Sequence, residues 1–346
     1  MRNYSQLTRE EEDRAVRIHK EAIVVDGLAT PIRTKGQFDR MLQGGVDACN
    51  WTIIDLDYDL RQTVREISAW YSLFREHHNK ITSVTSVEDI MEAKKQNKLG
   101  IIFGFQDPTP IILDISVIEA LYKLGMRVMG LTYNEKNAIG DGAGEQTDCG
   151  LSRFGERVVG EMNRLGILVD LSHSGRKTTT EAAEISKDPV VFTHANARAL
   201  CKSARNKSDE ELALIAEKGG VIGAAAWGPM LWSREGQRPT IDDYLNQIDY
   251  MVKLVGVDHV GIGLDIEEMF YTGEKGTEDS ARFRAKYAPH IIPPWDTDEN
   301  RYAKDLCSYV QFSNITKGLV GRGYSDQDVK KILGENFLRV LRKVWK

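Results

Sequence analysis

Residues Gly150 to His173 read GLSRFGERVVGEMNRLGILVDLSH, and this stretch decides the fold. A helix is predicted over Phe154–Leu165, because apolar residues recur there with a 3.6-residue period, at Phe154, Val158, Val159, Met162 and Leu165. Gly166 follows, where a glycine commonly ends a helix. The apolar run Ile167–Leu171 then predicts a strand, and His173 lies just past its end. The stretch therefore predicts a helix, a buried strand and a polar residue at the strand's carboxyl end.

Working outward from it, seven more short apolar runs are found, with helical patterns between them. The eight predicted strands are Ala22–Val25, Val46–Ile53, Gly100–Phe105, Val128–Thr132, Ile167–Leu171, Val190–Thr193, Gly220–Ala225 and His259–Leu264. Most are rich in Val and Ile and show little alternation, which is typical of strands buried on both faces of a parallel sheet. Strand followed by helix, repeated about eight times, predicts an α/β fold, a single-domain (β/α)8 TIM barrel over residues 1–346. An open doubly wound sheet is the alternative, but no GxGxxG motif follows the first strand.

Two long segments interrupt the pattern. They are loop insertions near 57–86 and 266–304, and each follows the carboxyl end of a predicted strand. Because a barrel places its active site at those strand ends, we expect both segments to form walls or lids of the site.

Composition excludes several classes of partner. The formal net charge is −5 and no long basic run occurs, so nucleic acid is not expected as a partner. No signal-peptide pattern opens the chain, and no stretch reaches the roughly 18 apolar residues of a membrane span. The four cysteines, Cys49, Cys149, Cys201 and Cys307, form no CxxC pair. We therefore expect free thiols and a cytoplasmic location, with no membrane association.

Polar residues follow most of the predicted strands, where a barrel gathers its functional side chains. His173, His194 and Asp265 come from three different strand ends, and such a set can supply metal ligands and a base. A single histidine in this position is more often only a hydrogen-bonded structural residue. Four further strand-end residues are candidates for contacting a substrate or its reaction intermediate: Asn50, Tyr133, Asn134 and Trp227.

Several long motifs resemble the membrane (renal) dipeptidase family, peptidase family M19 of the amidohydrolase superfamily. They are the Gly150–His173 stretch, THANARALC (Thr193–Cys201) with Arg205-Asn206, KGGVIG (Lys218–Gly223), DHVGIGLD (Asp258–Asp265) and RGYSDQDVKKILGENFLRVL (Arg322–Leu341). The resemblance extends from about residue 20 to the end of the chain. It implies a (β/α)8 barrel, which in this family is usually a dimer with two zinc ions.

The family's functional residues carry over only in part. By resemblance, His173 and His194 match the histidines that hold one zinc, Asp265 matches a proton-transferring aspartate, and Arg205 matches an arginine that grips the substrate's carboxylate. Four places depart from the family's pattern. Leu28-Ala29-Thr30 replaces a His-x-Asp pair, and Gln106 replaces a bridging Glu. Tyr133 replaces a histidine that stabilises the tetrahedral intermediate, and Cys49-Asn50-Trp51 replaces the glutamine region of the second strand.

These departures predict a reduced metal centre. Two divalent ions about 3.5–4 Å apart need bridging anions, which Gln106 cannot provide. One zinc held by His173, His194 and Gln106 is expected, and a metal-free site is the alternative. Asp26 or Asn50 could also take a ligand's place. Tyr133 could still stabilise an oxyanion, and Cys49 is expected to be a buried structural thiol rather than a nucleophile.

Three functions compete. The first is a dipeptidase-like, metal-dependent hydrolase that acts on a small amide or dipeptide-like carboxylate, with Asp265 and Tyr133 as catalytic residues and Arg205, Asn134, Asn50 and Trp227 as substrate contacts. The second is a lyase, dehydratase or isomerase on the same barrel, acting on a small carboxylate. The third is a binding protein without activity. A small-molecule carboxylate is the expected ligand, and a homodimer is the expected assembly.

Overall fold

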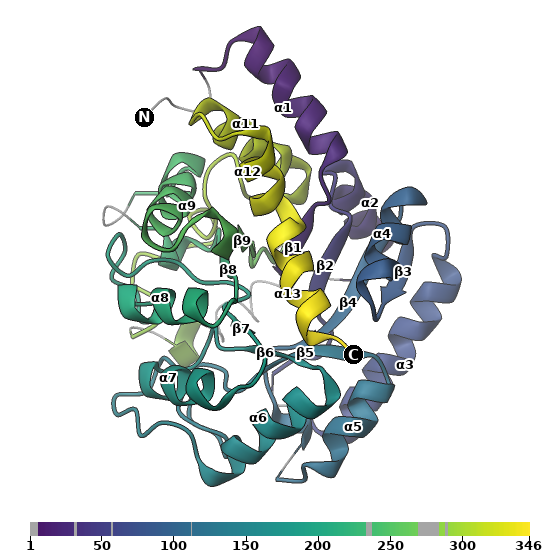
Figure 1. Cartoon of the computed structure of the whole chain (residues 1–346), viewed down its shortest axis with the longest axis vertical. Helices are drawn as coiled ribbons and strands as arrows, with labels where there is room; N and C mark the ends of the chain where they lie inside the picture. The colour runs from purple at the N-terminus through teal and green to yellow at the C-terminus, as the bar shows by residue number, and fades with distance from the viewer. Residues whose placement is uncertain are drawn as a thin grey trace.

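The computed structural model confirms the (β/α)8 TIM barrel (Figure 1). It describes residues 6–30, 33–56, 58–111, 113–232, 237–268, 284–287 and 290–346. The barrel strands are β1 (Val25–Ala29), β2 (Ala48–Thr52), β4 (Leu99–Phe105), β5 (Met126–Gly130), β6 (Leu168–Asp170), β7 (Val190–Val191), β8 (Ile222–Ala224) and β9 (Val260–Ile262). The helices are α1 (Arg9–Glu21), α2 (Lys35–Gln43), α3 (Leu60–Glu76), α4 (Val87–Lys95), α5 (Ser116–Lys123), α6 (Arg153–Leu165), α7 (Arg176–Ile185), α8 (Asp209–Glu217), α9 (Ile241–Val255), α11 (Ser313–Gly321), α12 (Asp326–Lys330) and α13 (Asn336–Val344).

The eight strands follow one another around the barrel. Parallel ladders join β1, β2, β4, β5, β6 and β7 in that order, and another joins β8 to β9. A parallel bridge between Phe192 and Ile222 links β7 to β8. The ring closes where the Asp265 backbone N–H, just after β9, donates to the Leu28 carbonyl of β1 at 3.1 Å.

Two details of the strands differ from the sequence-based expectation. The first strand lies later than predicted, at Val25–Ala29 rather than Ala22–Val25. It includes the polar residue Asp26, which is fully buried and accepts from the Leu264 N–H. The segment near 57–86, expected to be a wall or lid, contains α3 and a further strand, β3 (Ile81–Val84). Strand β3 pairs with the first half of β4, while β5 pairs with its second half. This segment therefore extends the sheet.

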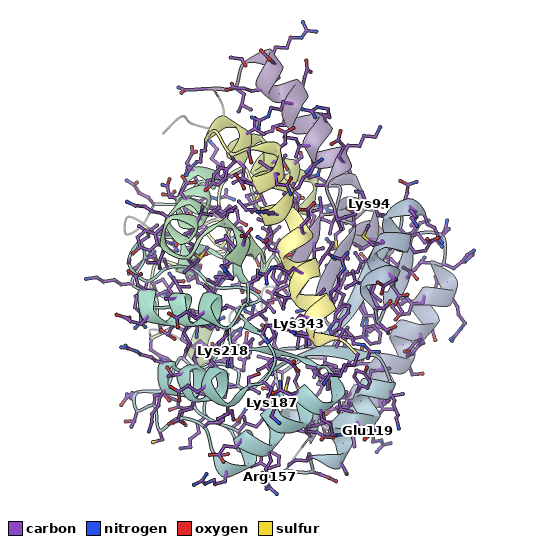
Figure 2. All side chains as sticks on the ribbon, in the orientation of Figure 1. Lys94, Glu119, Arg157, Lys187, Lys218 and Lys343 are labelled. Atoms are coloured by element: carbon purple, nitrogen blue, oxygen red, sulfur yellow. The ribbon has the colours of Figure 1, made fainter. Side chains whose placement is uncertain are left out.

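Helix α13 covers the amino-terminal end of the barrel. Its apolar side chains, including Phe337, Leu341 and Val344, pack with Val25, Ala48 and Leu168, the first residues of three strands. Figure 1 shows α13 crossing the ring of strands on this face. Figure 2 labels Lys187, Lys218 and Lys343 there, and they line a shallow basin beside the helix. A functional site must therefore lie at the opposite, carboxyl end of the strands, as in barrel enzymes generally.

Most helices begin as the sequence leads one to expect. The Ser208 side chain accepts from the Glu211 N–H, and the Glu211 carboxylate accepts from the Ser208 N–H, which completes a capping box at α8. Gly166 ends α6 with φ of 80°, a left-handed conformation that glycine adopts without strain. Among the residues that the structure describes, no helix is long and apolar enough to cross a membrane.

Candidate active site

A buried pocket lies at the carboxyl ends of the strands. Its lining residues are Tyr133, Asn134, His173, Arg205, Trp227, Asp265, Glu267, Arg301 and Tyr302. The described residues leave a cavity of about 20 Å³, close to the space of one water molecule. The first six of these residues were predicted from the sequence as site residues.

Two histidines and a glutamine converge beside this pocket. His173 Nε2 lies 2.8 Å from His194 Nε2 and 2.9 Å from Gln106 Oε1. The three side chains follow β6, β7 and β4, so the barrel geometry brings together residues up to 88 positions apart (194 − 106) in the sequence. The Tyr133 ring stacks on the His173 ring, with centroids 4.0 Å apart and planes inclined by 21°.

Asp170, the last residue of β6, holds this cluster in place. The Thr193 hydroxyl donates to Asp170 Oδ2 at 2.6 Å. Because that donation uses the hydroxyl hydrogen, the Thr193 hydroxyl oxygen accepts from His194 Nδ1, which lies 2.8 Å away. This network assigns the hydrogen of His194 to Nδ1 and leaves a lone pair on Nε2. His173 Nδ1 lies 2.8 Å from Asn134 Oδ1, which fixes the other ring in a similar way. Both Nε2 atoms therefore face the cluster as acceptors.

Arg205 occupies part of the same space. Its Nη2 donates to His194 Nε2 at 3.1 Å, and its Nη1 donates to the Ser172 carbonyl. The side chain is fully buried. Burial, followed by the nearby Arg205 guanidinium, lowers the pKa of His173 and His194 well below the usual value. Both imidazoles are therefore neutral at physiological pH.

Asp265 is the acidic group of the pocket. It lies three residues after β9 with φ of 56°, a conformation that costs energy in a non-glycine residue and is often found at functional sites. Burial, and then the charge of Glu267, raise the pKa of Asp265 to about 7, although Arg205 and Arg301 act in the opposite direction. Burial likewise raises the pKa of Tyr133 well above its usual value, so its phenol keeps its proton.

The described residues supply few metal donors beside the pocket. Leu28 is apolar and fully buried, and Thr30 lines a separate cavity with Trp51 and Tyr58. Within the described ranges, no three His, Cys, Asp or Glu side chains are grouped so that they could hold a metal ion. The remaining donors, His173 Nε2, His194 Nε2 and Gln106 Oε1, suit a single divalent ion, although all three are neutral. Arg205 and such an ion would need the same lone pair of His194.

Three other residues considered from the sequence do not line the pocket. Asn50 donates from Nδ2 to the Gly27 carbonyl at 2.9 Å inside the barrel, so the structure does not bring it to the pocket. Asp26 accepts from the Leu264 N–H at 2.8 Å and from the Tyr309 hydroxyl at 2.9 Å. Burial raises the pKa of Cys49 well above its usual value, which disfavours a nucleophilic thiolate.

Three residues of the pocket were not foreseen: Glu267, Arg301 and Tyr302. Glu267 lies two residues after Asp265 and could have been noticed as a second acid past the same strand. Arg301 and Tyr302 belong to the 266–304 segment, in which no sequence pattern distinguishes them from other polar residues. The described part of this segment forms one wall of the pocket, in agreement with the role expected for it.

Comparison with known proteins gives a consistent result. The family model described as membrane dipeptidase (peptidase family M19) matches residues 12–286. A dipeptidase of Schizosaccharomyces pombe that is itself uncharacterised is 29% identical over 289 residues, which cover 82% of this chain and 62% of that protein. The chain therefore spans less than two thirds of this relative. The dipeptidase verJ of Clonostachys rogersoniana is 26% identical over 88% of this chain and 75% of its own length.

Solved structures with the same fold include an amidohydrolase from Pseudomonas aeruginosa. It is 35% identical with a TM-score of 0.87, covering 96% of this chain and 99% of that one. A metallo peptidase from Rhodobacter sphaeroides, liganded with a phosphinate mimic of the dipeptide L-Ala-D-Ala, superposes with a TM-score of 0.77 at 20% identity, covering 94% of this chain and 100% of that one. At 20% identity, the similarity to the metallo peptidase shows only that the two proteins share a fold.

Proposed function

Because the chain belongs to the membrane dipeptidase family, peptidase family M19, we propose that it hydrolyses an amide bond in a small molecule that carries a free carboxylate. The family places the chain among the hydrolases. The observation that carries the proposal is that Arg205, Asp265 and Tyr133 line one buried pocket at the strand ends. Cleavage of a dipeptide-like amide requires an anchor for the carboxylate, a base for water and a donor for the oxyanion, and these three side chains can supply them.

Each residue has a distinct role. Arg205 binds the substrate carboxylate, for which its planar guanidinium suits two parallel hydrogen bonds. Asp265 accepts a proton from the attacking water, and a pKa of about 7 suits a group that must accept and later return that proton near neutral pH. Tyr133 donates its phenolic hydrogen to the oxyanion of the tetrahedral intermediate. Asn134 and Trp227 shape the pocket around the substrate.

A reduced metal site is part of the proposal. His173, His194 and Gln106 would hold one zinc ion, which when bound would polarise the substrate carbonyl and lower the pKa of water. When a substrate carboxylate draws Arg205 toward itself, Nε2 of His194 is released from its hydrogen bond with the guanidinium. We also propose a homodimer in the cytoplasm, which light scattering and cell fractionation would test.

The experiment is hydrolysis of a panel of dipeptides and N-acyl amino acids in oxygen-18-labelled water. Hydrolysis places the labelled oxygen in the new carboxylate, which mass spectrometry detects. Asp265→Asn and Arg205→Met should abolish the reaction. Asp258→Asn, at the other end of β9 and paired with Lys331, is the matched control that should leave it intact. Conversion of a small carboxylate without incorporation of label would contradict hydrolysis and favour the lyase or isomerase reaction.

A further inference from the structure

A second cavity, of about 520 Å³, lies on the outside of the barrel. It is bounded by α1 and α11, which pack against each other (Figure 1), and by the turns that lead into β2 and β4. Because these turns precede their strands, the cavity lies toward the amino-terminal end of the barrel, and it shares no lining residue with the catalytic pocket. Its volume falls within the roughly 300–1,000 Å³ of typical small-ligand sites.

Four lysine side chains from different elements line this cavity. They are Lys20 of α1, Lys94 of α4 (labelled in Figure 2), Lys98 of the turn before β4, and Lys317 of α11. Among the described lining residues, Asp47 is the one acid. The local charge is therefore about +3 (four lysines and one aspartate), in a chain whose formal net charge is −5.

The negative charge of Asp47 is already balanced. Its Oδ2 accepts from the Val24 N–H at 2.8 Å and from Lys94 Nζ at 2.9 Å. Lys94 Nζ also donates to the Ala22 carbonyl at 2.5 Å, which fixes this ammonium group on the cavity wall. Burial lowers the pKa of His19, another lining residue, so its ring adds no positive charge near neutral pH.

The other three lysines have no such balance. Within the described part of the chain, the side chains of Lys20, Lys98 and Lys317 form no ion pair and no hydrogen bond. Lys20 lies in the last turn of α1, where a cation stabilises the helix dipole, but that role does not extend to Lys317 in the middle of α11. Lys98 and Lys317 are both half-buried, so part of their hydration is lost without an anionic partner. A bound anion would supply that partner.

The lining also indicates which kind of anion fits. No arginine is found among the described residues of the cavity, whereas a planar carboxylate is best matched by the fork of an arginine. Lysines act as point charges and are common ligands of phosphate groups, which carry nearly two negative charges near neutral pH and accept several hydrogen bonds. The remaining wall includes the apolar residues Ala15, Val16, Leu42 and Val46, and Val16 is 61% exposed. A phosphate group attached to an apolar group would satisfy both parts of the wall.

We propose that this cavity binds a small phosphomonoester with an apolar group, and that Lys98, Lys317 and Lys94 hold its phosphate while Val16 contacts the apolar part. The site is separate from the catalytic pocket, so the inference does not depend on the proposed hydrolysis. Such a ligand would connect α1 and α11 to the turns before β2 and β4. Because it binds only the folded protein, it should also raise the Tm.

The experiment is calorimetric titration of the wild-type protein with phenyl phosphate, inorganic phosphate and benzoate. Phenyl phosphate should bind about tenfold or more tightly than either of the others, because it alone has both the phosphate and the ring. The double variant with Lys98→Met and Lys317→Met should weaken this binding by about tenfold or more and remove the Tm shift. Val16→Ser should weaken the binding of phenyl phosphate and leave that of inorganic phosphate unchanged.

The matched control removes two lysines from a different basic surface. Lys187 and Lys343 line the shallow basin beside α13, where both are exposed and where Asp188 and Glu217 also lie. The double variant with Lys187→Met and Lys343→Met changes the net charge by the same amount, and it should leave the affinity for phenyl phosphate unchanged.

Four results would overturn the inference. The first is that the folded wild-type protein binds no phenyl phosphate. The second is an equal loss of affinity in the two double variants, which would show that only the overall charge matters. The third is loss of binding in Arg205→Met, which would place the ligand in the catalytic pocket. The fourth is sedimentation with phosphatidic acid vesicles without binding of phenyl phosphate, which would indicate a membrane surface rather than a small ligand.

Discussion

At the scale of single residues, Asp265 is the group on which catalysis should depend. Its unprotonated form accepts the proton, and burial raises its pKa to about 7. We expect kcat/KM to rise with pH through about 7 and then to level off, because the fraction of ionised Asp265 increases. Asp265→Asn should lower kcat by about 100- to 10,000-fold. A pH–rate profile of both proteins checks this, and an Asp265→Asn variant that kept the wild-type profile would rule out the role.

Arg205 should govern metal affinity as well as substrate binding. Its guanidinium donates to His194 Nε2 at 3.1 Å and places a positive charge beside the neutral donor set. Arg205→Met should therefore tighten zinc binding about tenfold or more, since a charge-assisted hydrogen bond no longer competes for that lone pair. Competition with a chromophoric chelator measures the zinc affinity.

Gln106→Glu provides an independent comparison for the same site. It adds an anionic ligand where Gln106 Oε1 now lies 2.9 Å from His173 Nε2, so it should also tighten zinc binding. His173→Ala should weaken zinc binding in the wild-type protein and when it is combined with either Arg205→Met or Gln106→Glu. If zinc affinity stayed the same in Arg205→Met, Gln106→Glu and His173→Ala, the metal would not bind at this cluster.

At the scale of elements, Asp26 links strand β1 to the end of β9. Its carboxylate accepts from the Leu264 N–H and from the Tyr309 hydroxyl, and burial raises its pKa from 3.8 to about 7. The folded protein therefore binds the carboxyl proton of Asp26 more tightly than the unfolded chain does. Protonated Asp26 contributes its full stabilisation below about pH 4, and this stabilisation is lost as the pH rises through about 7.

Asp26→Asn should remove this dependence, because an amide keeps the acceptor for Leu264 and does not ionise. The variant should gain stability relative to the wild type as the pH rises toward 7, by up to about 4 kcal/mol. Urea unfolding at several values between about pH 5 and 8 measures the difference. Tyr309→Phe, which removes one donor to the carboxylate, should raise the pKa of Asp26 further and extend the loss of stability to higher pH. A constant difference between Asp26→Asn and wild type would contradict the raised pKa.

The elements also show what a sequence pattern can and cannot predict. Helix α6 was predicted with its correct end, because the apolar period stops at Leu165 and Gly166 supplies the left-handed residue. Strand β3 was missed, since Ile81–Val84 is short and its residues Thr82 and Ser83 look like a loop. Its pairing with β4 comes from the tertiary arrangement, in which β4 is long enough to hold two partners along one edge.

At the scale of the whole molecule, the sequence predicted the barrel because all eight barrel strands contain buried apolar residues. It also predicted six residues of the pocket, because residues just past parallel strands must meet at one end of the barrel. Arg301 and Tyr302 could not be predicted in this way, since they reach the pocket through the path of a long connection. Asn50 was expected there because it lies on a strand, but its side chain turns to the Gly27 carbonyl inside the barrel.

The small volume of the pocket leads to a prediction about the whole molecule. A cavity of about 20 Å³ is far smaller than the roughly 300–1,000 Å³ of typical small-ligand sites. We expect part of the wall to move when a substrate binds, and the wall that carries Arg301 and Tyr302 is a connection rather than a barrel strand. Its attachment includes an edge-to-face contact between Trp295 and Trp232, with centroids 5.9 Å apart.

We therefore expect backbone amides of residues 290–302 to exchange hydrogen faster than those of the barrel strands, and to slow when a non-hydrolysed dipeptide analogue binds. Trp295→Ala should speed exchange in this segment and leave β4 and β5 unchanged, because it removes a contact of the wall without touching the barrel. Hydrogen–deuterium exchange with mass spectrometry measures these rates in the free protein, in the protein with the bound analogue and in Trp295→Ala. Strong protection of residues 290–302 without ligand, equal to that of β4, would mean that substrate reaches Asp265 by another path, and the cavity near Thr30 and Arg33 would then be the place to look for it.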